Sequence, residues 1–325
     1  MKLNNIELTF ENFANEMAKL KNEKHFDYLV TIIGEDFGEE GLGCIYILEN
    51  TQNNERCSVR TIAKKVDGSD VIPTVTNLWK AADLLEREVF DFVGIKFLGH
   101  PDMRRLFLRT DFVGHPLRKD FDMSPEANKF PLTDEPEDDF TVEYSLDKDG
   151  HLVETKHRLF EEDEYVVNIG PNHPSTHGVL RLQTVIDGET VKRIYPHLGY
   201  IHRGIEKMWE GMTYPQTLAL TDRLNYLSAM MHRHALVGVI EEAMGIELSD
   251  RIRYIRTIMD ELQRIDSHLL FLGCTAQDLG ALTAFLYCMR DREHVLNVME
   301  ETTGGRLIMN YYRIGGLQAD IDPNF

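Results

Sequence analysis

The stretch IRYIRTIMDELQRIDSHLLFLGCTAQDLGALT, residues 252–283, has the apolar period of a long amphipathic helix. Its apolar residues recur three and four positions apart and form one stripe: Ile252, Ile255, Ile258, Leu262, Ile265 and Leu269. The same spacing occurs earlier in Leu224, Leu227, Met231, Ala235 and Val239. Because such stripes are buried against one another, the sequence predicts a mainly α-helical bundle over residues 204–325.

Upstream of the bundle, the apolar period changes to that of strands. Three short runs alternate or are rich in β-branched residues, at Tyr165–Ile169, Val179–Ile186 and Thr190–Pro196. The dipeptide Asp187-Gly188 between the last two is a strong hairpin signal. A short antiparallel sheet over residues 164–196 is therefore predicted to lead into the helices.

Residues 1–122 mix strand-like runs with helical patches and predict a separate small α+β domain. The strand-like runs are Tyr28–Ile33, Cys44–Leu48 and Ser58–Val66, and the helical patches are Phe10–Lys21 and Leu78–Val89. Residues 123–163 contain three prolines and the acidic run DEPEDD, a composition too charged to pack, and predict a linker. The domain that follows is expected to span residues 164–325, and the fold class is α+β.

Composition and charge limit the possible partners and chemistry. The 325 residues include 54 acidic and 35 basic side chains, and the formal net charge of −19 argues against nucleic acid or a broad anionic membrane surface as a partner. The four cysteines show no ligand spacing, so the chain is expected to hold neither a disulfide framework nor a metal of its own. No glycine-rich dinucleotide loop follows a strand, and no run of 18 or so apolar residues suggests a membrane-spanning helix.

The segment LEREVFDFVGIKFLGHPDMRRLFLRTDFVGHPLRKDF, residues 85–121, concentrates positive charge in this acidic chain. By themselves, its two Gly-His-Pro triplets would be turns, and its basic residues Arg104, Arg105, Arg118 and Lys119 a solvated face. The pattern ERExxDxxGIxFxGHPDxRR followed by GHPLRKD resembles the C subunit of the proton-pumping NADH:quinone oxidoreductase, complex I. That domain supports the peripheral arm and holds no redox centre, so the resemblance implies partner contact for the basic segment.

The second domain begins with NIGPNHPSTHGVLRL, residues 168–182, in which His173 and His177 are four positions apart. On a helix, such a pair could bind zinc, but Pro174 and the preceding Gly-Pro favour a loop, and there is no HExxH glutamate. Hydrogen-bonding structural histidines and a proton-handling loop both remain open at this point.

Three further residues have ordinary structural explanations when each is taken alone. Tyr226, in TDRLNYLSAMMHRH, would be a core residue on an apolar helix, Asp278 would cap the following helix, and Arg223 would form a helix ion pair. Together, the ordered motifs GPxHPSTHGVLRL, GYxHRGxEK, DRxxY, ELxRxxSHL, DLGALT and RIGG resemble the D subunit of complex I. The chain is thus identified as a fusion of the C and D subunits.

The D subunit is related to the large subunit of nickel–iron hydrogenases, so a nickel site is the first alternative. The hydrogenase motif places two cysteines where this chain has Asn225 and Ser228. Without those thiolates, soft metal ligation is unavailable at these positions.

In complex I, the loop with the paired histidines and the segment with the tyrosine converge on the quinone headgroup. The resemblance implies that His177 and Tyr226 hydrogen-bond the two quinone carbonyls and that Asp278 orients His177. His173 and Thr176 line the same site. An imidazole and a hydroxyl at opposite carbonyls would polarise and protonate the ring as electrons arrive.

The remaining implications concern the assembly around that site. Arg223 matches an arginine beside the terminal iron–sulfur cluster, which a partner subunit holds. The implied function is that of a peripheral-arm subunit of an enzyme that reduces quinone and translocates protons, with quinone as substrate and no tightly bound cofactor in this chain. Its partners would be other peripheral-arm and membrane-arm subunits, at the cytoplasmic face of the bacterial inner membrane. A non-catalytic scaffold subunit of complex I or of a hydrogenase-related complex is the alternative.

The end of the chain and two substitutions depart from the D-subunit pattern. D subunits continue beyond RIGG, so the D part is expected to be C-terminally incomplete at Phe325. Asn225 replaces the aspartate of DRxDY, which removes a charge beside Tyr226.

In GGRLIMNYYRIGG, Ile308 stands where many relatives carry a histidine that links reduction of the cluster to protonation. With no titratable group at this position, we expect the potential of the adjacent cluster to be nearly independent of pH. A redox titration of the assembled complex at several pH values checks this, and a clear slope of potential against pH would contradict it.

Overall fold

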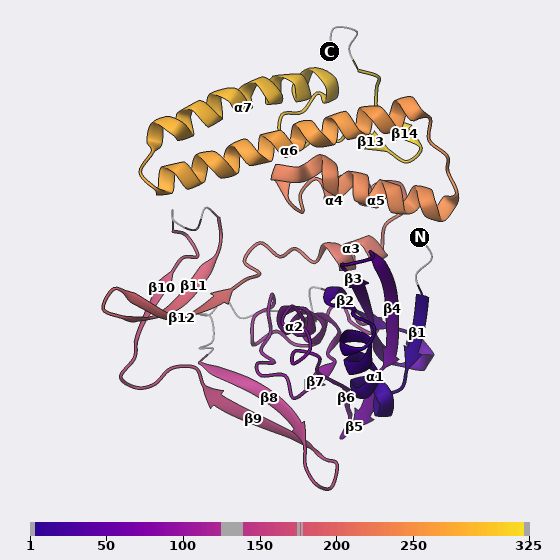
Figure 1. Cartoon of the computed structure of the whole chain (residues 1–325), viewed down its shortest axis with the longest axis vertical. Helices are drawn as coiled ribbons and strands as arrows, with labels where there is room; N and C mark the ends of the chain where they lie inside the picture. The colour runs from indigo at the N-terminus through magenta and orange to yellow at the C-terminus, as the bar shows by residue number, and fades with distance from the viewer. Residues whose placement is uncertain (1–3, 125–138, 174–175, 177, 322–325) are drawn as a thin grey trace. The chain divides into compact units, whose positions relative to one another are not determined.

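The computed structural model describes residues 4–124, 139–173, 176 and 178–321. The chain divides into two compact units, Met1–Gly204 and Ile205–Phe325. Figure 1 labels their helices and strands. The mixture of helices and antiparallel strands confirms the α+β class.

A four-stranded sheet packs with helix α1 (Phe10–Asn22) in the first core, which also contains buried residues of the helix Ala82–Val93. The sheet has the order β1-β4-β3-β2, with β1 and β4 parallel and the other pairs antiparallel. Its strands are β1 (Asn4–Leu8), β2 (Tyr28–Asp36), β3 (Leu42–Asn50) and β4 (Glu55–Ile62), and a short 3₁₀ turn, η1 (Gly38–Glu40), joins β2 to β3. Helix α1 (Phe10–Asn22) buries Phe13, Met17 and Leu20, whose spacing of four and three places them on one face.

A second sheet in the same unit has five strands in the order β5-β6-β7-β8-β9. They are β5 (Lys64–Val66), β6 (Ser69–Pro73), β7 (Lys96–Leu98), β8 (Phe140–Leu146) and β9 (Leu152–Arg158). The last two form a hairpin within residues 123–163, so the prediction of an unstructured linker is wrong there. The hairpin is held because the Val142 carbonyl accepts the Met103 amide at 2.6 Å and Tyr144 is buried in the core.

The predicted antiparallel sheet before the helices is present. Strands β10 (Tyr165–Ile169), β11 (Arg181–Asp187) and β12 (Thr190–His197) pair in that order, and Asp187-Gly188 makes the turn between the last two. The compact units divide after Gly204, so this sheet belongs to the first unit, whereas the sequence grouped it with the helices. The boundaries of the functional domains themselves remain a prediction.

Helix α2 (Ala82–Val93) carries a buried carboxylate, Asp91, that accepts four hydrogen bonds. Asp91 is fully buried, and its Oδ2 accepts the amides of Leu106, Phe107 and Leu108 at 3.0, 2.7 and 2.9 Å. Its Oδ1 accepts Arg105 Nη1 at 2.8 Å. The carboxylate therefore fixes the loop after β7 against α2.

These contacts correct one expectation for the basic segment. Arg104 is only 7% exposed and forms a two-nitrogen ion pair with Asp102. Arg105 also donates to the carbonyls of Phe112 and Gly114. Both arginines are used inside the unit, so the alternative of a solvated face is wrong for them, and the partner contact that the resemblance implies for the basic segment stays a prediction.

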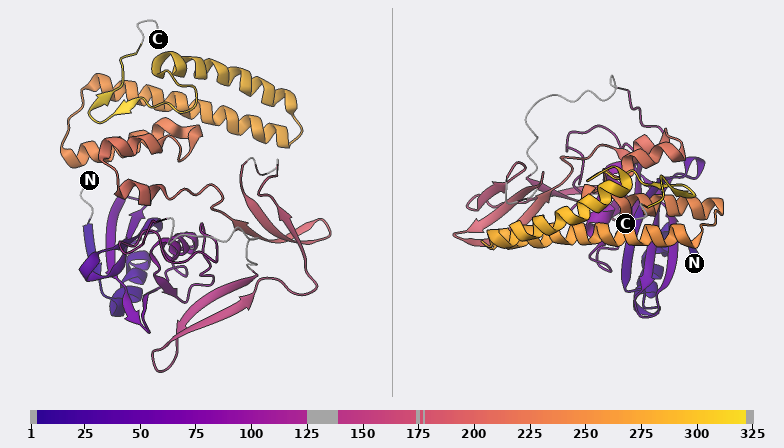
Figure 2. Two further views of the ribbon diagram at one scale, coloured as in Figure 1. Left: turned by 180° about the vertical axis from the view of Figure 1, so that it is seen from behind. Right: turned by 90° about the horizontal axis from the view of Figure 1, so that it is seen from above.

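The second unit is mainly helical (Figure 2). Its helices are α3 (Ile205–Glu210), α4 (Tyr214–Thr221), α5 (Ala229–Met244), α6 (Asp250–Asp278) and α7 (Leu282–Thr303), with the 3₁₀ turn η3 (Tyr226–Ser228) before α5. A two-stranded ribbon of β13 (Tyr312–Arg313) and β14 (Gly316–Leu317) follows. Helices α6 and α7 form a long hairpin.

The predicted apolar stripe on α6 is only partly buried. Ile255 is buried, but Ile258 and Ile265 are 43% and 48% exposed. The buried face instead includes Arg256, Gln263 and Asp266. This face is stable because its charges are paired, with Arg256 bound to Glu241 through two contacts of 2.8 Å.

Burial of Glu86 on α2 generates a stability prediction. Its carboxyl is fully buried and accepts the Val75 amide at 2.8 Å and the Thr74 hydroxyl at 2.6 Å. The nearby His100 ring, 4.0 Å away, offers little compensating charge because burial lowers its own pKa. Burial raises the pKa of Glu86 to about 8. At pH values between the ordinary pKa of a glutamate and about 8, Glu86 is protonated in the folded chain and ionised in the unfolded chain. The free energy of unfolding therefore falls as pH rises through that range.

We expect Glu86→Gln to become progressively more stable than the unsubstituted chain from pH 5 to pH 8, by on the order of a few kcal/mol at pH 8. Urea unfolding of the full chain, followed by fluorescence of the buried Trp79 in a Trp209→Phe background, measures this. The exposed Glu39→Gln is the control. Parallel pH dependences for Glu86→Gln and the unsubstituted chain would contradict the assignment.

Candidate functional site

The loop between β10 and β11 carries the predicted histidines. It begins at Gly170, which has φ +96°, and a Cβ there would lie 1.9 Å from the Leu180 carbonyl oxygen. Only glycine permits this approach of the two ends of the loop. The loop is therefore closed at its base by the backbone.

Within the loop, Thr176 contacts the backbone of His173. The Thr176 amide donates to the His173 carbonyl at 3.1 Å, and the Thr176 hydroxyl lies 2.8 Å from the same oxygen. The His173 side chain is exposed. His177, the predicted quinone ligand, lies outside the described residues. The loop location of His173 agrees with the sequence, but the chemical role of both histidines remains a prediction.

Tyr226 is the first residue of the 3₁₀ turn η3 and is 52% exposed. The alternative of a core tyrosine on an apolar helix is therefore wrong. Asn225 precedes the turn in an extended conformation, and its side-chain oxygen accepts the Leu227 amide at 3.1 Å. The capped turn separates α4 from α5 and leaves the phenol of Tyr226 accessible.

A buried polar chain attaches this turn to the helical hairpin. Gln263 Nε2 donates to the Leu227 carbonyl at 3.2 Å and to Asp266 at 3.1 Å. Asp266 in turn pairs with Arg292 of α7 at 2.8 Å. Burial raises the pKa of Asp266, and Arg292 opposes this shift. The position of Tyr226 thus depends on Gln263, Asp266 and Arg292.

Sequence reasoning did not select these three supporting residues. Gln263 and Asp266 are three positions apart and four and seven positions after Met259, so they share its buried face. Polar residues at helical spacing within an apolar segment were the available signal. This signal was missed because the apolar stripe from Ile252 to Leu269 predicted that a different face of the helix is buried.

Arg223 follows α4 beside a buried ion pair. Its neighbour Asp222 pairs with Arg233 at 2.9 Å, and both side chains are almost completely buried. Burial raises the pKa of Asp222, and Arg233 opposes this. Arg223 is exposed and donates through Nη1 to the Ala219 carbonyl. The buried pair fixes the end of α4 and leaves the Arg223 guanidinium on the surface.

Asp278 is the last residue of α6 and is exposed. The expectation that it caps the following helix is wrong, because α7 begins at Leu282 with Ala281 as its N-cap. A carboxylate in the last helical turn is disfavoured by the helix dipole. Helix stability therefore does not explain an aspartate at this position.

The predicted site residues fall in both units. His173 and Thr176 belong to the first unit, and Arg223, Tyr226 and Asp278 to the second. Within the second unit, η3 packs on α6 through Gln263, and Asp278 lies at the end of the same helix. Among the described residues, no cluster of three or more histidine, cysteine or acidic side chains could hold a metal, and no helix is long and apolar enough to cross a membrane.

Comparison with known families assigns both ends of the chain. Residues 6–127 match the 30 Kd subunit of the respiratory-chain NADH dehydrogenase, and residues 278–325 match its 49 Kd subunit. The fold and these matches thus define a chain that joins two subunit types of this dehydrogenase.

Curated relatives make the assignment more specific. The chain is 56% identical over 98% of its length to the C/D subunit of the NADH-quinone oxidoreductase of Phocaeicola vulgatus, and covers 61% of that protein. It is 41% identical over 95% of its length to the second of two such C/D subunits of Aquifex aeolicus, and covers 55% of it. The chain thus spans little more than half of these relatives. It belongs to the family of fused C/D subunits of NADH-quinone oxidoreductase.

The cap at Asn225 can be tested with two substitutions, of which only one removes the acceptor oxygen. Asn225→Ala removes the acceptor of the Leu227 amide, whereas Asn225→Asp retains an acceptor oxygen. Loss of a cap costs about 1 kcal/mol, so amide exchange at Leu227 should accelerate roughly fivefold in Asn225→Ala and little in Asn225→Asp. Hydrogen exchange of the full chain measures this. Equal exchange rates in the two variants would show that the cap does not hold the turn.

Proposed function

We propose that this chain is a peripheral-arm subunit of NADH-quinone oxidoreductase and forms part of its quinone-reduction site. The observation that carries the proposal is the exposed phenol of Tyr226. Its turn is capped by Asn225 and attached to α6 by Gln263. A capped turn that presents a hydroxyl to the outside is suited to donate a hydrogen bond to a carbonyl of a bound quinone.

The histidine loop supplies the complementary half of the proposed chemistry. Its base is closed at Gly170, where the backbone of Leu180 approaches too closely for a Cβ. In this proposal, His177 hydrogen-bonds the second quinone carbonyl, and His173 and Thr176 line the loop. Asp278 orients the His177 imidazole and stabilises its protonated form. Two proton donors then serve the two oxygens that become hydroxyls.

The electrons come from an iron–sulfur cluster of a partner subunit, beside which we place Arg223. Its exposed guanidinium would favour the reduced state of a neighbouring cluster. Residues 1–122 support the arm through contact with other subunits, and membrane-arm subunits hold the assembly at the membrane. Coupling to proton translocation belongs to that assembly rather than to this chain alone.

Tyr226→Phe in the assembled complex tests the proposal, because it removes one hydroxyl and leaves the cap and the backbone contacts intact. We expect quinone reduction to fall by about 10²-fold, the effect of losing a preorganised donor. NADH oxidation by a soluble artificial acceptor should stay unchanged. Assembly, judged by the size of the purified complex, should also be normal.

Tyr254→Phe is the matched control, since Tyr254 is an exposed tyrosine of α6 outside the proposed site. Unchanged quinone reduction in Tyr226→Phe would reject a catalytic role and favour the scaffold alternative.

A further inference from the structure

The buried carboxylate of Asp266 is the acidic member of the polar chain that ends at the turn of Tyr226. Asp266 is 1% exposed on α6 and forms an ion pair with Arg292 of α7 at 2.8 Å. Arg292 Nη2 also donates to Asp266 Oδ2 at 3.3 Å. The other oxygen, Oδ1, accepts no hydrogen bond among the described residues. The carboxylate is therefore paired in charge but only partly satisfied by donors.

Gln263 connects this carboxylate with the backbone of the turn. Its Nε2 donates to the Leu227 carbonyl at 3.2 Å and to Asp266 Oδ2 at 3.1 Å. A reversed amide would place Oε1 against two acceptor oxygens, so an ionised Asp266 permits only the orientation that bonds the Leu227 carbonyl. In the part of the chain that the structure describes, Gln263 Oε1 is buried and has no hydrogen-bond partner. The two contacts of Nε2 therefore fix the orientation of this amide.

A proton on Asp266 would remove this constraint. A neutral carboxyl group donates as well as accepts, and a hydrogen bond to it is weaker than one to a carboxylate. The amide of Gln263 would no longer have to face Asp266 with its donors, and the Leu227 carbonyl would lose a fixed partner. The charge attraction between Asp266 and Arg292 would be lost at the same time. The ionisation of Asp266 thus determines how firmly η3 is attached to α6.

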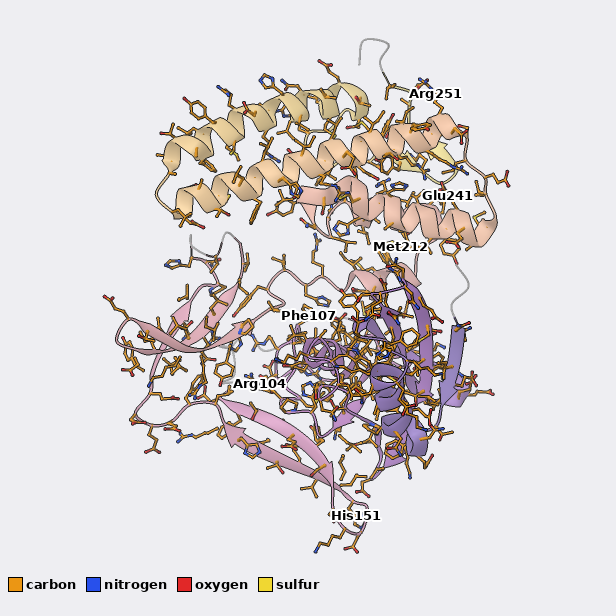
Figure 3. All side chains as sticks on the ribbon, in the orientation of Figure 1. Arg104, Phe107, His151, Met212, Glu241 and Arg251 are labelled. Atoms are coloured by element: carbon orange, nitrogen blue, oxygen red, sulfur yellow. The ribbon has the colours of Figure 1, made fainter. Side chains whose placement is uncertain are left out.

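A second buried pair of this unit, Glu241 with Arg256, is more fully bonded. Glu241, which lies on α5 (Figure 3), accepts two nitrogens of Arg256 at 2.8 Å and the Gly315 amide at 2.7 Å. Burial by itself would raise the pKa of Glu241, but these donors outweigh burial and the pKa is lowered. At Asp266, burial prevails and raises the pKa, although Arg292 opposes this shift. Of these two carboxylates, Asp266 is therefore the first to take up a proton as pH falls.

Arg292 is the charge that acts most directly on Asp266. From η3, the polar chain presents a neutral backbone carbonyl, and from the same helix it presents the neutral amide of Gln263. Arg264, also on α6, pairs with Glu261 on the exposed face of the helix. Among the described residues, no charged group of α5 or of the β13–β14 ribbon forms an ion pair with Asp266. Its ionisation therefore depends on the balance between burial and Arg292.

We propose that ionised Asp266, held by Arg292, acts through Gln263 as a positioning residue that keeps Tyr226 in place for quinone reduction. This inference rests on the proposed function of Tyr226 and adds a dependence on proton uptake at a residue that does not touch the quinone. Above the raised pKa of Asp266, the carboxylate is ionised and the turn is fixed. Below that pKa, the turn is released and the phenol is less well aligned. Quinone reduction should therefore fall on the acid side as Asp266 is protonated.

Arg292→Gln in the assembled complex tests the direction of this effect. Removing the opposing charge raises the pKa of Asp266 further, so the acid limb of quinone reduction should move to higher pH by about one unit or more. Arg292→Lys keeps a positive charge and should leave the limb near its original position. Arg290→Gln, which removes an exposed arginine of the same helix, is the matched control. NADH oxidation by a soluble artificial acceptor at each pH corrects for upstream steps.

Gln263→Leu locates the effect at the turn. It removes both contacts of the amide, and we expect quinone reduction to fall about tenfold, the effect of losing one hydrogen bond that holds the phenol. In a Tyr226→Phe background, the same substitution should have little further effect, because the hydroxyl that Gln263 positions is absent. Hydrogen exchange of the full chain gives a readout without activity. Amides of η3 should exchange faster in Gln263→Leu, and in the unsubstituted chain at acid pH after correction for the intrinsic rate.

Thermal unfolding of each variant verifies that it is folded, and if Arg292→Gln does not assemble, the Gln263 variants and the exchange measurements decide. The proposal is overturned if the acid limb of Arg292→Gln coincides with that of the unsubstituted complex. It is also overturned if Gln263→Leu lowers quinone reduction by the same factor with and without the Tyr226 hydroxyl, or if exchange in η3 does not respond to Gln263→Leu. The proposed function fails by a different result, which is unchanged quinone reduction in Tyr226→Phe itself.

Discussion

The carboxylate of Asp91 is the contact on which the first unit depends. One oxygen accepts three consecutive amides, and the other accepts Arg105, whose second nitrogen reaches two further carbonyls. Removing this acceptor would leave several buried amides without a partner, a larger loss than that of one average hydrogen bond. The bonded amides belong to the loop after β7, so this one carboxylate fixes the conformation of three successive residues of that loop.

In the second unit, buried ion pairs rather than a single carboxylate hold neighbouring elements together. Its buried pairs, Asp222 with Arg233, Glu241 with Arg256 and Asp266 with Arg292, connect α4, α5, α6 and α7. Buried pairs add little stability compared with apolar packing, but losing one partner is costly, so they disfavour alternative registers of the helices. Through Gln263, this ordering extends to η3 and hence to Tyr226.

The sequence predicts the elements of this fold better than their faces and contacts. The 3.6-residue period locates the long helices, and Asp187-Gly188 locates the hairpin, since both signals are local. The orientation of α6 could not be predicted in this way, because paired polar groups occupy its buried face and a hydropathy pattern treats them as solvated. The β8–β9 hairpin lies beside prolines and an acidic run, and its place in a sheet depends on long-range pairing of β8 with β7, which no local signal reveals. For the candidate site, the motifs select residues, but the turn at Tyr226 requires knowledge of the cap and of Gln263.

Asn225 departs from the DRxDY motif, but the geometry of the turn that it caps is retained. Compared with an aspartate, the asparagine removes a negative charge beside Tyr226, yet its amide oxygen still caps the turn. The capping of the turn and the charge beside the phenol are therefore separable properties at this position. A chain can change the charge next to the tyrosine while keeping the hydroxyl in place, because the cap requires only an acceptor oxygen and the anchor at Gln263 lies on another helix. A substitution at this position can thus change the local charge while the cap and the position of Tyr226 are retained.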